Sequence, residues 1–217
     1  MSEFFDEVDE EVRREQLKRL WEKYSLFIIA AALLVIAAVG GWRGYQYLEA
    51  KKAAVLGDSF NKAIDLSEQG KHAEAEAAFN DIAAKAPYGY RTLARFRAAG
   101  EAASQDPNAA VKMLDAIAAD SGVGVDMQAL ARVRAAGILV DTASYADMKQ
   151  RLEADTAPGA TFRHSARELL ALSAWRVNDA ADARKWLDMI TADADTPPGL
   201  RQRAQALQAL LPPVAKS

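Results

Sequence analysis

The chain has 217 residues, a net charge of −3 at neutral pH and no cysteine. Setting aside one long apolar stretch leaves about 175 residues, enough for a single domain with its own core. From residue 43 onward acidic and basic side chains balance, so the sequence lacks the basic excess with which proteins bind nucleic acid. Without cysteine, the sequence carries no information about the redox compartment.

Residues 1–23 hold eight acidic and five basic side chains and form a predicted cytoplasmic segment. Phe5, Val8 and Val12 have the spacing of a narrow apolar stripe on a helix. Two roles fit this stripe. It could dock on the cytoplasmic face of a membrane partner, or rest on lipid headgroups as an extension of the helix that follows.

Residues 24–42 contain no charged side chain between Lys23 and Arg43. As a helix they would extend about 28 Å, close to the ~30 Å hydrocarbon core of a bilayer. A buried helix of a soluble core and a cleaved signal peptide are the alternatives, but the long charged segment before the stretch disfavours a signal peptide. We therefore predict a transmembrane helix over 24–42. Its expected interface anchors are Trp21, Tyr24, Trp42, Arg43 and Tyr45.

The orientation of this helix follows from the Lys and Arg residues near its ends. Five precede the apolar stretch, and three follow it within a similar distance. This asymmetry predicts a cytoplasmic N-terminus, with everything after Trp42 on the far side of the membrane. Residues 43–52 would form a juxtamembrane linker, and residues 53–217 the domain beyond it.

A triplet of small, large and apolar residues recurs in the rest of the chain. Its first copy, Ala75, Phe79 and Ile82, lies at i, i+4 and i+7 and is followed by Pro87. The two other clean copies are Ala110, Leu114 and Ile117, and Ala183, Leu187 and Ile190. A degenerate copy lies between them, at Met148 and Leu152, with Asp155 where an apolar residue is expected. Such self-similarity is typical of stacked helical hairpins, which bury their apolar faces against neighbouring repeats.

The repeat spacing and the turn residues predict four helix pairs and a capping helix. The pairs are 53–69 with 71–86, 88–104 with 107–119, 126–141 with 144–155 and 161–177 with 180–191, and the cap is 199–210. The fold class is therefore all-α, with one N-terminal transmembrane helix followed by an α-solenoid. Ala94, Ala98, Ala129 and Ala136 either pack inside this solenoid, which we favour, or leave room for a partner.

The run from Gly70 to Pro87, with its Gly-Lys-x-Ala-Glu-Ala start and its Phe79, resembles a tetratricopeptide (TPR) repeat. The whole layout of acidic N-terminal segment, membrane helix and repeat domain resembles the YfgM family, ancillary subunits of the SecYEG translocon. This resemblance implies an inner-membrane protein with a periplasmic repeat domain. It also implies the SecYEG translocon and a PpiD-like periplasmic chaperone as partners. The degenerate third repeat departs from the pattern.

The sequence contains no recognisable catalytic, cofactor-binding or metal-binding motif, so we predict a protein that is not an enzyme. His72 and His164 belong to different repeats and are expected to be exposed. Asp193 and Asp195 are interpreted as solvated loop acids. Trp175 and Trp186 are expected to pack against each other or against the cap.

Three arginines flank Phe96 on one predicted helix: Arg91, Arg95 and Arg97. A solvated helix face is the expected reading, and recognition of an acidic partner segment is the alternative.

Taken together, these features predict a membrane-anchored scaffold at the Sec protein-export translocon that presents a binding surface for a periplasmic chaperone or for protein clients. The alternative is a repeat scaffold of cell-envelope assembly or division. An enzyme or an enzyme's accessory subunit is the least favoured reading.

Overall fold

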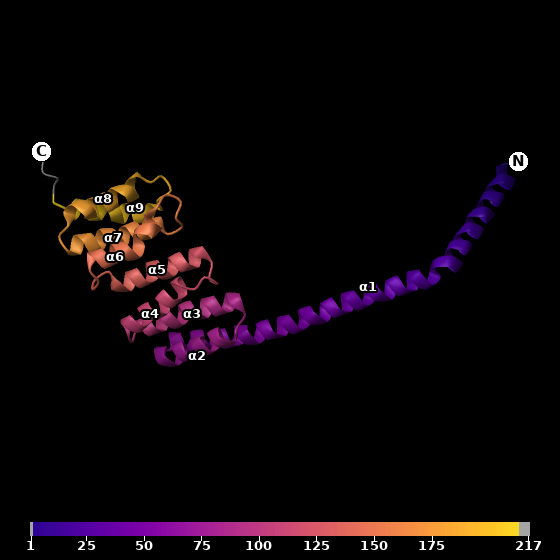
Figure 1. Ribbon diagram of the computed structural model, residues 1–217, viewed down its shortest axis with the longest axis horizontal. Coiled ribbons are helices and arrows are strands. Elements are labelled where there is room, and N and C mark those ends of the chain that lie inside the picture. The colour runs from indigo at the N-terminus through magenta and orange to yellow at the C-terminus, as the bar shows by residue number, and fades with distance from the viewer. Residues whose placement is uncertain (1, 213–217) are drawn as a thin grey trace. The chain divides into compact units, whose positions relative to one another are not determined.

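The computed structural model describes residues 2–212, which are helical with connecting turns and contain no strand (Figure 1). The helices are α1 (Ser2–Glu68), α2 (His72–Lys85), α3 (Tyr88–Ala103), α4 (Pro107–Ala118), α5 (Val125–Leu139), α6 (Tyr145–Leu152), the 3-10 helix η1 (Glu153–Thr156), α7 (Arg163–Arg176), α8 (Ala180–Ala192) and α9 (Pro198–Leu210). The predicted fold class is confirmed.

Helix α1 is a single helix of 67 residues. It includes the predicted N-terminal segment, the apolar stretch, residues 43–52 and the first predicted helix of the repeats. A separate helix beginning at residue 53 was wrong, because no residue from 43 to 68 ends a helix, and the glycines that fall there only weaken it locally. The stripe side chains Phe5, Val8 and Val12 lie outside the described part of the structure.

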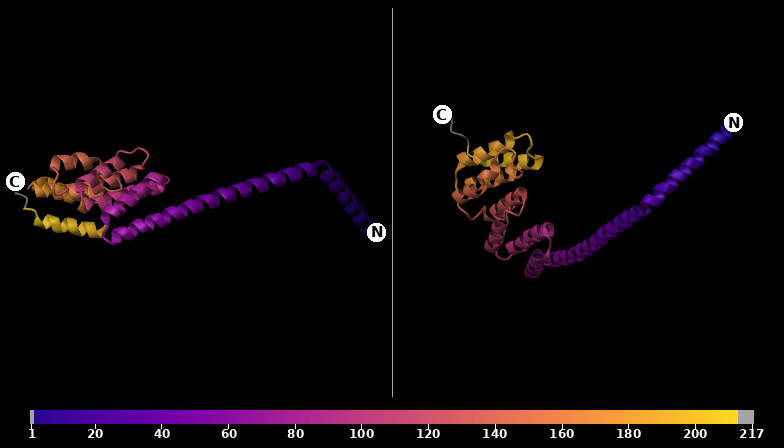
Figure 2. Two further views of the ribbon diagram at one scale, coloured as in Figure 1. Left: turned by 90° about the horizontal axis from the view of Figure 1, so that it is seen from below. Right: turned by 45° about the vertical axis from the view of Figure 1, so that its right-hand side comes forward.

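The chain divides into two compact units, residues 1–55 and residues 56–217. The part of α1 from Trp21 to Glu68 is long and apolar enough to cross a membrane, and no residue of its most apolar window is buried. In the second unit, helices adjacent in sequence pack against each other from α2 to α9 (Figure 2). The final segment of the predicted domain, residues 213–217, lies outside the described residues.

The turns between the helices carry the chemistry that their conformations require. Gly70 (φ 74°) and Asn178 (φ 60°) occupy the left-handed region that ends a helix and reverses the chain. Asp106, Ser144 and Asp179 cap α4, α6 and α8 by accepting hydrogen bonds from backbone N–H groups of the first turn. Local sequence thus sets where the paired helices begin and end.

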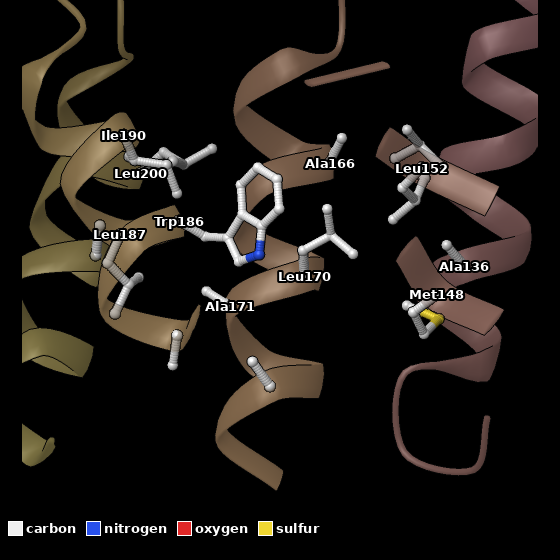
Figure 3. Close-up of a cluster of buried hydrophobic side chains, with 14 of the residues drawn as sticks. Ala136, Met148, Leu152, Ala166, Leu170, Ala171, Trp186, Leu187, Ile190 and Leu200 are labelled. Carbon is white, nitrogen blue, oxygen red and sulfur yellow. The ribbon is translucent and has the colours of Figure 1, made fainter. Parts of the chain in front are cut away.

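The interior of the second unit consists of three apolar clusters along the stack. The first surrounds Phe60 and Phe79, whose rings meet edge to face with centroids 5.1 Å apart. The second surrounds Phe96, Leu114 and Ile117. The third and largest lies at the C-terminal end, where the Trp186 side chain extends from α8 toward Leu170 of α7 (Figure 3). Each cluster is shared by neighbouring repeats, as a solenoid requires.

The degenerate third repeat is completed by an ion pair. Helix α6 ends at Leu152 and η1 follows, so Asp155 does not continue the apolar stripe of α6. Asp155 is buried and accepts two hydrogen bonds from Arg132 of α5, both at 2.7 Å. This bidentate contact replaces the missing apolar residue and raises the pKa of Arg132.

The interpretation of Asp193 as a loop acid in solvent was wrong. Its carboxylate accepts hydrogen bonds from Arg163 Nε at 2.8 Å and from Arg167 Nη1 at 3.0 Å. These contacts, with the bond from Arg163 first, hold the pKa of Asp193 far below its ordinary value. Asp195 is exposed, but it also accepts a hydrogen bond from Arg163, at 3.0 Å. Buried Arg167 further donates to the Thr156 carbonyl, so this network joins η1, α7 and the turn after α8.

The expectation that both histidines are exposed was wrong for His164. Its ring is buried, with Nδ1 3.1 Å from the Thr196 hydroxyl. Burial, followed by the charge of Arg163, lowers the pKa of His164. His72 is partly exposed, and its Nδ1 lies 2.8 Å from a carboxylate oxygen of Glu101.

The two C-terminal tryptophans form no ring pair with each other among the described contacts. Trp186 is buried and donates from Nε1 to the Tyr145 hydroxyl at 2.8 Å, which ties α8 to α6. Burial raises the pKa of that tyrosine to about 12. Trp175 is partly exposed and lies beside Leu207 and Leu211 at the cap.

Candidate functional site: a groove between α3 and α5

An open groove of about 710 Å³ lies between α3 and α5. We call it the α3–α5 groove. It is lined by Gly89, Thr92, Leu93, Phe96, Arg97, Gly100 and Glu101 on one side, and by Val123, Gly124, Met127, Leu130 and Arg134 on the other. Its volume lies within the roughly 300–1,000 Å³ range of ligand sites. All lining residues belong to the second unit.

Helical periodicity puts these residues on one surface. On α3 the lining positions recur every three or four residues from Gly89 to Glu101, which places them on one face of the helix. The opposite face of α3 carries Ala94 and Ala98, which are buried against the first repeat. Small residues on the packed face and larger residues on the groove face therefore give α3 two distinct sides.

The floor of the groove is apolar and partly exposed. Phe96 is buried, whereas Leu93 and Met127 are 48% and 46% exposed. Gly100 lies within the same stripe of α3, and a methyl group added there would meet no atom within 4 Å. The groove can therefore accept an apolar group from outside without moving its walls.

The charged residues of the groove are two arginines and one glutamate. Arg134 lies over the ring of Phe96, with its guanidinium carbon 5.3 Å from the ring centroid. The side chains of Arg97 and Arg134 make no ion pair or hydrogen bond among the described residues, and both are exposed. Arg95, one position away from Phe96, instead pairs with Asp120 at 2.6 Å.

The carboxylate of Glu101 is engaged by the first repeat. One oxygen accepts a hydrogen bond from Ser67 Oγ at 2.7 Å, and the other lies 2.8 Å from His72 Nδ1. Glu101 is buried. It links the end of α1, the start of α2 and α3, and it forms no ion pair with Arg97 or Arg134 among the described contacts.

The nine residues of the repeat triplets lie in the interior. Ala75, Phe79, Ile82, Ala110, Leu114, Ile117, Ala183, Leu187 and Ile190 are all buried. They position the helices that form the groove and do not line it. Ala136 is also buried, and Ala129 is partly exposed.

The predicted membrane-interface residues belong to the first unit. Trp21, Tyr24, Trp42, Arg43 and Tyr45 are exposed along α1. Trp42 and Tyr45 lie side by side, with ring centroids 6.3 Å apart. Their exposure is the arrangement that a lipid-facing helix requires.

Most of this site could not be predicted from the sequence. Arg97 lies beside Phe96 in the sequence, but Met127 and Arg134 come from α5, and no sequence pattern connects α5 to α3. The available signal was the spacing of Leu93, Phe96 and Arg97 at i, i+3 and i+4 on one face. No group of three or more metal-ligating side chains is present in the part of the chain that the structure describes.

Stacked helix pairs closed by a capping helix, with a groove between two nonadjacent helices, define an α-solenoid of the repeat class. The chain belongs to the tetratricopeptide repeat-like domain family, which matches residues 18–195. The match begins before the apolar stretch and so includes it. Comparison with curated proteins and with solved structures finds no match. Domains of this class are scaffolds for protein–protein interaction.

Proposed function

We propose that this protein is a membrane-tethered adaptor of the Sec protein-export translocon that holds a periplasmic chaperone or an emerging client in its α3–α5 groove. The observation that carries this proposal is the open, partly apolar groove in a repeat domain whose chain also contains a helix apolar enough to span a bilayer. The translocon and chaperone partners come from the resemblance to the YfgM family.

The proposed arrangement has four parts. Residues 1–23 lie in the cytoplasm, residues 24–42 span the inner membrane, residues 43–52 adjoin it, and residues 53–217 form the periplasmic domain. Trp21, Tyr24, Trp42, Arg43 and Tyr45 hold the ends of the span at the two interfaces. The excess of Lys and Arg before the span supports this orientation.

Tethering supplies the mechanism. A partner that is also fixed to the same membrane or channel meets the groove at a high effective concentration, so a weak contact suffices for frequent occupancy. A groove of this size holds a short segment of a partner and releases it readily. Such turnover suits an adaptor that passes clients along.

Site-specific photocrosslinking in membranes tests the proposal. A photoreactive amino acid replaces Leu93 in the full chain, and the control carries it at Lys112, which is exposed on α4 outside the groove. We expect translocon subunits or a periplasmic chaperone to crosslink at Leu93 and not at Lys112. Recovery of wall-synthesis or division proteins instead would assign the scaffold to envelope assembly.

The orientation has its own test. A reporter enzyme that is active only outside the cytoplasm is fused after Ser217. We expect activity in intact cells. An inactive fusion of normal abundance would reverse the proposed topology.

A further inference from the structure

We propose that the α3–α5 groove binds an acidic segment of a partner protein in which a large apolar side chain is flanked by carboxylates. This inference rests on the proposed function, because it specifies the chemistry of the partner at the same site. It is carried by the charges that the groove leaves unpaired and by the apolar surface beside them.

The arginines of the groove differ from most others of the repeat domain. Several arginines meet carboxylates of the same domain: Arg95 with Asp120, Arg132 with Asp155, Arg151 with Asp115, Arg163 with Asp193 and Arg203 with Glu168. Arg176, Arg184 and Arg201 donate to backbone carbonyls. Among the described residues of the second unit, the side chains of Arg91, Arg97 and Arg134 have no hydrogen-bond or ion-pair partner, and of these only Arg97 and Arg134 line the groove. Two guanidinium groups are thus available to carboxylates from outside.

The apolar part of the groove adjoins these two charges. Leu93, one turn from Arg97, and Met127, two turns from Arg134, stay half exposed and line the groove together with the buried Phe96. A large apolar side chain placed here would remove them from water, which contributes roughly 25 cal/mol for each Å² buried. Methionine adapts to apolar groups of different shape, so one partner sequence is not required.

The one carboxylate of the groove does not change this assignment. Glu101 uses both oxygens for Ser67 and His72, and it is buried. Two guanidinium groups therefore face one engaged carboxylate. A basic segment would be repelled by the arginines, and a purely apolar segment would cover them without replacing their hydration. An acidic segment with an apolar anchor satisfies both features.

Selection from a random peptide library tests this chemistry directly. The full chain in phospholipid nanodiscs is the target, and a library of random dodecapeptides displayed on phage is the probe. We expect the bound peptides to be enriched in Asp and Glu on both sides of a large apolar residue. Selection of basic or uncharged peptides would overturn the inference.

Two variants with matched controls connect binding to the groove. The double charge reversal Arg97→Glu with Arg134→Glu should weaken binding of a selected peptide at least about tenfold, as loss of close charge pairs does. Lys112→Glu makes the same kind of charge change outside the groove and should leave binding intact. Equal affinity for the double variant and the unchanged protein would overturn the inference.

The second variant fills the groove without changing charge. Gly100→Leu places a side chain where an added Cβ meets open space, so we expect the fold to be retained and the apolar anchor to be excluded. The control is Gly199→Leu, since Gly199 on α9 also has open space around it. We expect loss of peptide binding for Gly100→Leu only, and unchanged binding for this variant would overturn the inference even if the charge variant failed to fold.

The outcomes also separate this inference from the proposed function. Crosslinking of a partner at Leu93 together with selection of non-acidic peptides would reject the inference and leave the adaptor function standing. Failure to crosslink any protein at Leu93 in membranes, together with selection of acidic peptides, would reject the adaptor function and keep the chemistry of the groove.

Discussion

The guanidinium groups of Arg163 and Arg167 meet Asp193 near the C-terminal end of the repeat stack, whereas those of Arg97 and Arg134 in α3 and α5 face solvent. Both sets lie on helices of the same repeat type. In the first set a carboxylate from the turn after α8 reaches the arginines and seals the neighbouring helices together. In the second set neither arginine forms an ion pair among the described residues, although Arg95 and Arg132 on the same two helices pair with Asp120 and Asp155. The position of each arginine on its helix therefore decides whether it acts as an internal link or remains available to a partner.

The largest expected effect is the loss of an internal link. Arg167→Met keeps the side-chain volume but removes the bonds to Asp193 and to the carbonyls of Thr156 and Met189. Because the buried Thr156 carbonyl and two partly buried acceptors lose this donor, we expect a destabilisation of about 3 kcal/mol. Amide hydrogen exchange in α7 and α8, measured on the full chain in detergent, reports this destabilisation.

The matched control for that prediction lies in the groove. Arg97→Met removes an exposed arginine without a described partner, so the free energy of opening should change by no more than about 0.5 kcal/mol. Similar losses for Arg97→Met and Arg167→Met would contradict the contrast between the two regions.

Removing the ion pair of the third repeat should have an effect on stability between those of Arg167→Met and Arg97→Met. Asp155→Ala leaves Arg132 without its bidentate acceptor, but that guanidinium is about one-third exposed and can regain water. We expect a loss of about 2 kcal/mol. Protection of amides in α5 and α6 reports the change, and loss of protection confined to other helices would argue against a structural role for this pair.

Acidification should loosen the C-terminal region before the groove region. Burial lowers the pKa of His164 in the folded protein. When the pH falls below about 6.5, the ordinary pKa of histidine, the unfolded state therefore binds a proton more readily than the folded state, and the free energy of unfolding decreases. Arginine contacts lower the pKa of Asp193 in the folded protein. The contribution of its carboxylate to the free energy of unfolding is therefore complete above about pH 3.9, the ordinary pKa of aspartate, and is lost as the pH falls further.

Thermal unfolding of the full chain in detergent between pH 7 and pH 3 measures this dependence. His164→Gln removes the first titrating group, so its stability should vary less between pH 7 and pH 5 than that of the unchanged protein. An identical pH dependence for the two proteins would show that His164 does not contribute.

A small gain in stability is expected in the groove region. Gly100→Ala in α3 meets open space and should stabilise the domain by roughly 0.5–1 kcal/mol, because alanine has less backbone freedom to lose on folding. Gly70→Ala is the control. Its positive φ strains any side chain, so stability should fall there. A loss for Gly100→Ala would mean that the groove is more closely packed than described.

The sequence by itself determined the all-helical fold, the repeat, the paired helices after residue 70 and the apolar stretch, because each depends on periodicity or on local turn residues. Ala75, Phe79 and Ile82 specify a buried stripe wherever their helix packs, and Asp106 caps a helix through its immediate neighbours. Two helix boundaries differed most from the prediction. No residue ends α1 before residue 53, and α6 ends at Leu152, where the helix predicted over 144–155 gives way to η1.

Only the tertiary structure decided which charged side chains are buried and which partners they contact. Asp155, Asp193 and His164 look like surface residues in the sequence, and their partners Arg132, Arg167 and Thr196 are distant along the chain. The groove has the same origin, because Phe96 and Arg134 come together only when α3 and α5 are stacked. Ionic partners and grooves depend on which helix faces lie opposite each other, and no local rule of helix formation encodes that choice.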